Sequence, residues 1–370
     1  MEPAEVVLRF LASVGRADDA EFYLALFRAE AKERFALLHV DANVMRGAAD
    51  AVALELGFLA ALGLTPTGTL GLFAPAEAGE DARSLRRRLD AAKVPAAIVG
   101  SGADAAAAAR RGEIPIVALA GPNGDDREVQ LMGLVAELAS RKLIFLARAG
   151  GFRVRGEVVP LVNLSTEAEA LGRSRDLSRK EQEILGFARQ VVFGVRHRLT
   201  VSMTSPLDLL RELFTVKGAG TMMRRGAVFL RQRPDEVDRD RLAALLASSF
   251  GRPPVETFFE QAIAEVYVEE AFRGAAVMVD TPLAPYLSKF AVEREAQGEG
   301  VGRDLWETLV DDHPRFFWRA RPSNPIAAWY TKVCDGMTRL PEWHVFWRGL
   351  AAGEIPAAIE LALQAPVDFT

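Results

Sequence analysis

The stretch from Tyr286 to Gly302 constrains the fold of this chain most. An apolar run from Leu287 to Val292 is typical of a buried strand, and the glycine-rich turn Gln297-x-x-Gly300-x-Gly302 follows it. An amphipathic segment begins directly after the turn. Strand, glycine turn and helix N-terminus together direct several free backbone N–H groups and the positive end of a helix dipole at one point. The sequence therefore predicts a pyrophosphate-binding turn that does not depend on lysine side chains.

Strand-like and helical segments alternate in the first part of the chain. Apolar runs at residues 35–40, 95–99, 114–119 and 143–146 are separated by helical stretches at 48–62, 81–92 and 126–140. Before them, residues 3–31 are typical of two short amphipathic helices. The alternation favours a three-layer α/β/α domain around a largely parallel sheet.

A polar stretch at residues 231–238 is the best candidate for a linker between domains. It places a boundary near residue 226, and each part of the 370-residue chain is long enough to bury its own core. Helical patterns at 239–249 and 257–264 follow the linker, and a second α/β region comes after them. We therefore expect a helical arm at 1–31, an α/β domain at 32–225 and a second α/β domain at 226–370.

The composition is that of a folded globular protein, with 50% apolar and 26% charged residues. A net charge of −5 provides no overall basic field, so we expect neither nucleic-acid nor membrane binding. The longest uncharged run, residues 56–76, is broken by glycines and prolines and is typical of helix, turn and strand rather than of a membrane span. The single cysteine, Cys334, excludes intrachain disulfides and cysteine-rich metal sites. No signal-peptide pattern follows Met1, and a cytoplasmic protein is the expectation.

Aromatic and basic residues cluster after the glycine turn. They read Phe316-Phe-Trp-Arg-Ala-Arg321, Asn324-Pro325, Trp329-Tyr330 and Trp343-x-x-Phe346-Trp347. With the glycine turn, this series resembles the N-acetylglutamate synthases of arginine biosynthesis, which join an amino-acid-kinase fold to a C-terminal GNAT-type acetyltransferase domain. The resemblance covers nearly the whole chain, is close over residues 201–350 and is strongly degraded over 35–120. It implies a glutamate N-acetyltransferase, with a shortened, degenerate kinase-like domain at 32–225 and a GNAT domain at 226–370.

The resemblance also implies how the amino-acid acceptor is held. Fixed cations are needed for the two carboxylates of glutamate, and guanidinium groups suit them best. The positions at which this family grips glutamate correspond here to Lys289, Arg319, Arg321 and Asn324, and all four residue types are intact. Without the resemblance, the arginines would more often be surface or ion-paired residues, and Lys289 would extend along a strand edge.

A tyrosine protonates the departing thiolate in this family, and it corresponds here to Tyr330. A phenol is protonated at neutral pH and is a weaker acid than a thiol, so it can act as the general acid. The alternative is a half-buried core tyrosine beside Trp329. The family's Asn-Pro before this pair is Ala327-Ala328 here, a departure in the loop. No general base is evident, since His313 is expected to be a loop residue and water can take the amine proton.

Acetyl-CoA is the cosubstrate that the resemblance implies, and no metal is expected. Backbone groups of Phe290, Ala291 and Val292 would bind the pantetheine arm. The pyrophosphate would be held by the turn, which comprises Gln297, Gly298, Gly300, Val301 and Gly302. Apolar residues after the turn form the buried stripe of its helix.

The kinase-like half lacks the residue types of phosphoryl transfer. The family's first strand ends in Lys-Val-Gly-Gly, and this chain reads His39-Val40-Asp41-Ala42 there. A glycine-rich phosphate loop of the family reads Gly71-Leu72-Phe73-Ala74 here. The cation and the glycines that let a backbone approach phosphate are gone, and Asp41 would repel phosphate. The segment between Pro75 and Ile114, which would carry the acetylglutamate pocket, is tens of residues shorter. We therefore predict a catalytically dead domain that binds no ATP.

Residues 202–221 closely resemble the family segment that helps to form the arginine feedback site. Arginine would bind at the turn formed by Lys217, Gly218, Gly220 and Thr221, through backbone carbonyls and the threonine hydroxyl. The alternative is a helix C-cap glycine at Gly218 followed by a tight turn. The arm at 1–31 corresponds to the family's oligomer-forming segment, so a homo-oligomer, either a dimer or a tetramer, is expected.

Three functions compete at this point. The first is a glutamate N-acetyltransferase with a dead kinase-like domain that serves regulation and assembly. The second is a bifunctional synthase and kinase, against which the lost phosphate loops argue. The third is a non-catalytic, arginine-sensing scaffold, against which the intact acceptor residues and Tyr330 argue.

Overall fold

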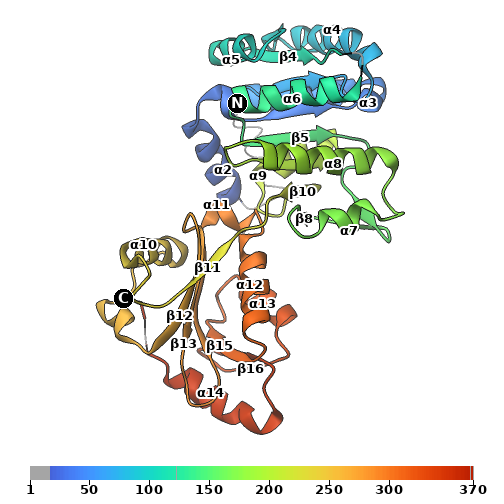
Figure 1. Cartoon of the computed structure of the whole chain (residues 1–370). Helices are drawn as coiled ribbons and strands as arrows, with labels where there is room; N and C mark the ends of the chain where they lie inside the picture. The colour runs from blue at the N-terminus through green and yellow to red at the C-terminus, as the bar shows by residue number, and fades with distance from the viewer. Residues whose placement is uncertain (1–16, 122, 367, 370) are drawn as a thin grey trace. The chain divides into compact units, whose positions relative to one another are not determined.

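Two compact units, residues 1–226 and 227–370, make up the chain. The computed structural model describes residues 17–121, 123–366, 368 and 369. Figure 1 shows one sheet with its helices in each unit. Of the helices expected over residues 3–31, the structure describes α2 (Ala17–Ala29), and the remainder lies outside the described residues.

Eight strands form the main sheet of the first unit, in the order β3-β4-β2-β1-β5-β9-β10-β8. Every neighbouring pair is parallel except β9 and β10. The strands are β1 (Leu37–Val40), β2 (Thr67–Leu70), β3 (Ala96–Ile98), β4 (Ile114–Ala118), β5 (Lys142–Leu146), β8 (Leu161–Asn163), β9 (Thr200–Thr204) and β10 (Thr221–Arg224). β1 and β9 are buried along their whole length, as expected of parallel strands covered on both faces.

Helices cover both faces of this sheet. Because side chains alternate along a strand, Leu38 belongs to an apolar cluster with α2, α3, α4 and α9, while Leu37 belongs to a cluster with α6 and α8 on the other face. The predicted three-layer α/β/α domain is therefore confirmed. The helices are α3 (Ala42–Ala61), α4 (Pro75–Ala91), α5 (Gly102–Arg111), α6 (Gly124–Glu137), α7 (Ala168–Gly172), α8 (Arg179–Gly194) and α9 (Leu209–Phe214), with short turns η1 (Lys32–Arg34) and η2 (Pro206–Asp208) and a hairpin of β6 (Arg153–Val154) and β7 (Glu157–Val158).

Seven strands form the sheet of the second unit, in the order β11-β12-β13-β14-β15-β17-β16. They are β11 (Phe229–Gln232), β12 (Ile263–Glu269), β13 (Gly274–Val279), β14 (Tyr286–Val292), β15 (Phe316–Ala320), β16 (Gly336–Arg339) and β17 (His344–Arg348). The helices are α10 (Arg239–Phe250), α11 (Arg294–Gln297), α12 (Val301–Asp312), α13 (Ala327–Val333) and α14 (Ile355–Gln364), with short turns η3 (Glu256–Glu260) and η4 (Ala352–Glu354).

Apolar side chains on both faces of this second sheet are covered by helices. Phe316 and Trp318 pack in a cluster with α12 and α13, while Phe317, between them, packs with α14 on the opposite face. α10 covers the β12 and β13 part of that opposite face. Within the described residues, no helix is both long and apolar enough to cross a bilayer.

Two local expectations were wrong. The helix expected at 257–264 is the short turn η3, and β12 begins at Ile263. Residues Ile263–Glu269 include three β-branched side chains and pair with strands on both sides. The linker expected at 231–238 begins inside β11, where Arg231 pairs with Tyr267 of β12. In both places strand pairing outweighs the local sequence signal.

Glu55 is a buried carboxyl group in the first unit. It lies on α3 and accepts a hydrogen bond from the Leu210 backbone, near the carboxylate of Asp208. Its Oε2 atom has no hydrogen-bond partner among the described residues. Burial, assisted by the Asp208 charge, raises the pKa of Glu55 to about 7.

This raised pKa predicts a pH-dependent loss of stability. The unfolded chain releases the Glu55 proton near pH 4.5 and the folded protein near pH 7, so the free energy of unfolding falls as pH rises through that window and stays reduced above it. Glu55→Gln is neutral throughout, and we expect it to raise Tm by roughly 2–4 °C or more at pH 8 and little at pH 5. Thermal unfolding at both pH values, with the exposed Glu157→Gln as control, measures the difference. Equal shifts at both pH values would contradict this explanation.

Candidate functional site

Strands β14 and β15 separate after only two paired positions. Tyr286 pairs with Phe317 and Leu287 with Trp318, whereas β13 stays paired with β14 as far as Val292. A register shift in the β13 pairing makes Ser288 an extra residue, a β-bulge, at the point of separation. Beyond the bulge, the edge of β14 on the β15 side has no strand partner in the described sheet. Such an edge can bind an extended ligand through strand-like hydrogen bonds.

The bulge also changes which side chains face which layer. Leu287, Phe290 and Val292 all belong to the cluster that packs with α12 and α13. Lys289 points to the other face, where its ammonium lies 5.4 Å from the ring centroids of both Phe258 and Phe369. One strand therefore contributes an apolar edge to one face and a buried cation to the other.

The glycine turn after β14 leads into α12, as the sequence predicts, with the short helix α11 between them. Gly300 has a φ of 74°, a left-handed conformation that favours glycine, and α12 starts at the next residue. The N–H groups of Val301 and Gly302 lie in the first turn of α12 and have no intrahelical acceptor. A Cβ on Gly302 would lie 3.3 Å from Cγ2 of Val292, so glycine allows α12 to approach β14 closely. The turn thus presents free amides beside the open edge of β14.

Gln297 closes this turn from within. Its Nε2 atom donates to the carbonyl of Val292 at 3.1 Å, which holds α11 against the end of β14. The side chain is therefore engaged with the backbone, and the part of the turn that can face a ligand is the amide array of residues 300–302. The expected apolar stripe of α12 is buried, and it comprises Val301, Leu305, Trp306 and Leu309.

Tyr330 lies on α13 inside an aromatic cluster. Its ring centroid is 5.4 Å from that of Trp318 and 5.5 Å from that of Phe346. The side chain is buried, and burial raises the pKa of Tyr330 above its ordinary value. The phenol is consequently protonated at neutral pH, as a general acid must be.

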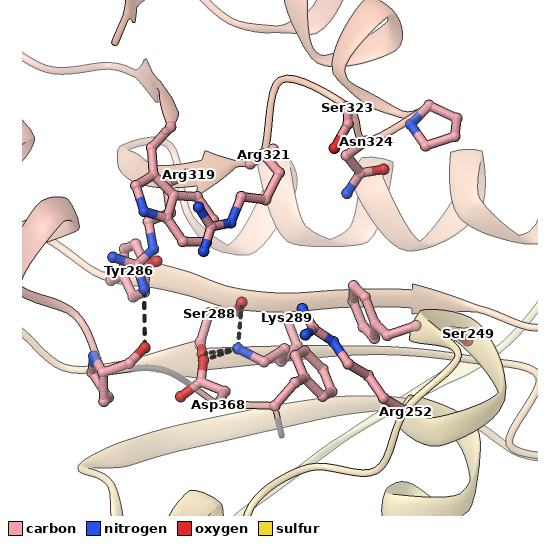
Figure 2. A pocket seen from close by; sticks show the side chains of 16 residues that line it. Ser249, Arg252, Tyr286, Ser288, Lys289, Arg319, Arg321, Ser323, Asn324 and Asp368 are labelled. Atoms are coloured by element: carbon pink, nitrogen blue, oxygen red, sulfur yellow. Dashed lines mark hydrogen bonds and ion pairs between the residues drawn. The ribbon is translucent and has the colours of Figure 1, made fainter. Parts of the chain in front are cut away.

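A cavity of about 370 Å³, here called the C-terminal cavity, lies beside the bulge. Figure 2 shows basic and polar side chains of β14, β15 and the loop after β15 around it. All four acceptor residues expected from the sequence line it: Lys289, Arg319, Arg321 and Asn324. The structure adds residues that the sequence analysis did not identify as part of a site, among them Arg252, Ser288 and Asp368.

Lys289 has a partner for each of its ammonium protons. It donates to the carbonyl and to the hydroxyl of Ser288, both at 3.0 Å, and forms an ion pair with the carboxylate of Asp368. Burial lowers the pKa of Lys289, and the Asp368 carboxylate opposes that shift. The cation is thus satisfied by groups of the chain itself.

Arg319 is bound to the end of α14. Its guanidinium donates to the carbonyls of Ala362 and Ala365 at 2.7 and 2.9 Å and also to those of Leu363 and Pro366, which supplies hydrogen-bond partners for the last turn of the helix. The guanidinium also lies 4.0 Å from the ring centroid of Trp343. Arg319 therefore positions the segment that follows α14.

Arg321 and Asn324 line the C-terminal cavity from the loop after β15. The Arg321 guanidinium lies 4.0 Å from the ring centroid of Trp343 and forms a loose ion pair, 3.6 Å long, with Glu342. Its side chain is about half exposed, so this pair is weak. The Asn324 side chain accepts from the Ile326 amide at 3.2 Å and stabilises the loop before α13.

The two degraded phosphate loops of the first unit line one smaller cavity, of about 210 Å³, at the carboxyl ends of β1 and β2. We call it the N-terminal cavity. Lys180 of α8 enters it, forms an ion pair with Asp41 and lies 5.1 Å from the ring centroid of Phe73. The sequence analysis missed this cation because it follows the loops by more than a hundred residues. Burial lowers the pKa of His39 to about 3, with a smaller effect of Lys180, so the imidazole is neutral.

The turn expected to bind arginine is held by side chains of the same unit. α9 ends at Phe214, so Gly218 is not its C-cap, although its φ of 62° is left-handed. Glu212 accepts from the Ala219 amide at 2.7 Å. The Thr221 hydroxyl accepts from the Phe152 amide at 2.7 Å and is buried, whereas Lys217 is exposed.

Comparison with known proteins identifies the family. The family described as NAT, N-acetyltransferase, of N-acetylglutamate synthase matches residues 229–360. The human mitochondrial N-acetylglutamate synthase is 30% identical in an alignment 388 residues long. The alignment covers 90% of this chain and 73% of the human protein. The chain belongs to the N-acetylglutamate synthase family. The family resemblance inferred from the motifs is confirmed.

Other relatives of this N-acetylglutamate synthase family member extend the comparison. An acetylglutamate kinase of Xanthomonas campestris is 35% identical over 258 residues, covering 66% of this chain and 61% of that protein, so the chain spans less than two thirds of this curated relative. The fold is that of N-acetylglutamate synthase from Neisseria gonorrhoeae. Its complex with coenzyme A and N-acetylglutamate gives a TM-score of 0.53 at 17% identity, with 89% of this chain and 98% of that chain covered. The complex of the same gonococcal protein with coenzyme A and L-arginine gives a TM-score of 0.57 at 16% identity, with 90% of this chain and 97% of that chain covered.

Proposed function

We propose that this chain is an N-acetylglutamate synthase, which transfers acetyl from acetyl-CoA to the α-amine of L-glutamate. The observation that carries the proposal is the separation of β14 and β15. Neighbouring elements contribute an amide-rich turn and a protonated tyrosine, and β14 and β15 also line a cavity that contains several cations. Relatives named as N-acetylglutamate synthases, and the gonococcal protein solved with coenzyme A and N-acetylglutamate, support it.

The open edge of β14 suits the pantetheine arm. Backbone groups of Phe290, Ala291 and Val292 follow the bulge, where β15 no longer pairs with them. Amide groups of an extended ligand can continue the sheet there, and the pyrophosphate then reaches the amides of Val301 and Gly302. The thioester would lie near the bulge, between Tyr330 and the C-terminal cavity.

The reaction needs one bond formed, one broken and two proton movements. The neutral α-amine of glutamate attacks the thioester carbonyl, the C–S bond breaks, and the thiolate of CoA takes a proton from the Tyr330 hydroxyl. The amine proton passes to water, and the phenolate is reprotonated from solvent. The Tyr330 phenol is suited to this step because its raised pKa keeps it protonated. The acceptor carboxylates would be held by Lys289, Arg319, Arg321 and Asn324.

A substitution in the turn tests the cosubstrate site. Gly300→Asp forces an L-residue into a left-handed conformation and adds a negative charge beside the pyrophosphate, so we expect acetyl-CoA to bind at least about 10-fold more weakly. Isothermal titration calorimetry measures this. Gly112→Asp, at the left-handed C-cap of α5, is the control for backbone strain alone. An unchanged affinity in folded Gly300→Asp would place the cosubstrate elsewhere.

Removal of the phenol tests the acid. Tyr330→Phe should leave acetyl-CoA affinity nearly intact and lower kcat by about 10²-fold, at the low end of general acid catalysis because thiolates leave readily. Steady-state kinetics with a thiol-detecting reagent measure kcat, and Tyr23→Phe, a buried tyrosine of the first unit, is the control. A wild-type rate in Tyr330→Phe would end this assignment.

We also propose that the first unit does not phosphorylate acetylglutamate. Phosphoryl transfer depends on cations placed around the migrating phosphate. The cations that line the N-terminal cavity, Lys180 and Arg46, are paired with Asp41 and Glu77. The bifunctional alternative is favoured by Lys180 itself and by the Xanthomonas relative named acetylglutamate kinase. Calorimetry of the full chain with ATP and Mg²⁺, and an assay for acetylglutamyl phosphate, separate the two. We expect no specific heat and no product; micromolar ATP binding that Lys180→Ala abolishes would restore the bifunctional enzyme.

Regulation by L-arginine is part of the same proposal. The effector would bind at the turn of Lys217, Gly218, Gly220 and Thr221, where Glu212 supplies a buried carboxylate. The gonococcal protein solved with L-arginine supports an effector site in the family fold. A homo-oligomer assembled through residues 1–31 and a cytoplasmic location complete the proposal.

A further inference from the structure

A short segment after α14 enters the C-terminal cavity. We call it the post-helix segment and define it as Ala365, Pro366, Asp368 and Phe369. Its last three members line the cavity. Asp368 is the only carboxylate among the described residues that do so, and it faces a lining that contains Arg252, Lys289, Arg319 and Arg321. An acidic group of the chain therefore occupies a cavity suited to acidic ligands.

Asp368 is paired with Lys289, the cation that an acceptor carboxylate would need. One oxygen forms the ion pair with Lys289, and the other accepts from Nε2 of Gln261 at 2.7 Å. Figure 2 shows Asp368 and Lys289 joined at the wall of the cavity. The remaining Lys289 protons are used by Ser288. A ligand carboxylate can therefore reach this ammonium only by replacing one of these partners, and the Asp368 carboxylate is the one that carries the same charge.

Because the site is buried, one ligand carboxylate can enter only as the Asp368 carboxylate leaves. The side chains of Lys289 and Asp368 are 6% and 10% exposed. A buried ammonium requires one counter-charge, and a second carboxylate would bring an unpaired negative charge into the same place. The carboxylate of an acceptor can neutralise Lys289 in place of Asp368. The released Asp368 carboxylate can then be hydrated.

Arg319 donates to the carbonyls of Ala365 and Pro366 and holds the start of the post-helix segment. The end of the segment, Asp368 and Phe369, is held by separate contacts. The Val255 amide donates to the Asp368 carbonyl at 2.9 Å, and Pro254 forms an isolated bridge with Phe369. The Phe369 ring packs against that of Phe250 at 4.7 Å between centroids. No strand ladder in the described sheet includes these residues.

We propose that Asp368 is an internal competitor of the acceptor: it neutralises Lys289 while the C-terminal cavity is empty, and the acceptor's carboxylate displaces it. The inference rests on the proposed function, since it takes Lys289 as part of the acceptor site. The apparent affinity for the acceptor is then the intrinsic affinity multiplied by the fraction of molecules in which the post-helix segment is displaced. Acetyl-CoA binding, at the other side of the bulge, is independent of it.

Two variants of the post-helix segment test the competition through the Michaelis constant for glutamate. Asp368→Asn keeps the shape and the contact with Gln261 but loses the charge. Phe369→Ala removes the ring contacts with Phe250 and Lys289 without altering any charge. We expect each to lower KM for glutamate by about 3-fold or more, with kcat and the KM for acetyl-CoA within twofold of wild type. The matched control is Glu360→Gln, which removes an exposed carboxylate from α14 without contact to Lys289.

Hydrogen–deuterium exchange of the unmodified protein supplies a readout that a purely structural role would not give. The Val255 amide depends on the Asp368 carbonyl, so saturating L-glutamate should accelerate exchange in the peptide that contains Val255. Unchanged or slower exchange would mean that the segment stays in place as a wall of the site, and it would overturn the proposal.

The kinetic outcomes separate this inference from the proposed function. A lower KM in either folded variant supports the competition, and a KM equal to or above wild type in every folded variant overturns it while leaving the synthase intact. A wild-type protein that acetylates no glutamate overturns the proposed function and this inference with it.

Discussion

The β-bulge at Ser288 is the feature on which the candidate site depends. It ends the pairing of β14 with β15 after two positions and so creates an unpaired strand edge. The same extra residue shifts the alternation of side chains, so that Phe290 packs toward α12 while Lys289 turns to the opposite face. Without the extra residue, strict alternation from Leu287 would place the Lys289 side chain in the apolar layer under α12. The bulge thus marks both the open edge, which we propose binds the cosubstrate, and the turn of Lys289 toward the C-terminal cavity, which we propose binds the acceptor.

Much of this arrangement was predictable from the sequence, because it is encoded locally. The strand, glycine turn and helix at 286–302 need only a period-two apolar run, glycines and an amphipathic stretch, and the alternating elements of residues 35–146 fixed the three-layer class. The boundaries of α6 and α10 were predicted to within a few residues, whereas α3 begins six residues before its expected start and α8 was not predicted. The prediction of a helix at 257–264 was wrong because β12, which begins at Ile263, forms by pairing with β11 and β13, and no local sequence pattern indicates that pairing.

The parts that could not be predicted are contacts between residues far apart in the chain. Lys289 and Asp368 are separated by 79 positions, and Lys180 enters a cavity formed by loops near Asp41 and Phe73. An isolated aspartate near the end of the sequence has no pattern that marks it as a partner of a buried lysine. The sequence therefore identified which residue types the site contains, and the three-dimensional fold was needed to show which of their charges are already neutralised.

Each unit neutralises a lysine that lines its cavity with a carboxylate of the chain, but the two carboxylates differ in their freedom to release it. In the first unit, the carboxylate paired with Lys180 belongs to Asp41, whose other oxygen accepts from the Asn43 amide at 2.7 Å as the N-cap of the 20-residue helix α3. Withdrawing Asp41 would uncap that helix, which costs about 1 kcal/mol in addition to the ion pair. In the second unit, Asp368 belongs to a short segment outside any named helix or strand. Its own anchors besides Lys289 are the Val255 amide and the Gln261 side chain, and the neighbouring Phe369 packs against Phe250. A carboxylate that also caps a helix remains in place when an anion approaches, whereas one on a segment outside helix and sheet can be exchanged. This difference explains why, on the proposed function, the N-terminal cavity is closed to phosphate while the C-terminal cavity still admits an acidic acceptor.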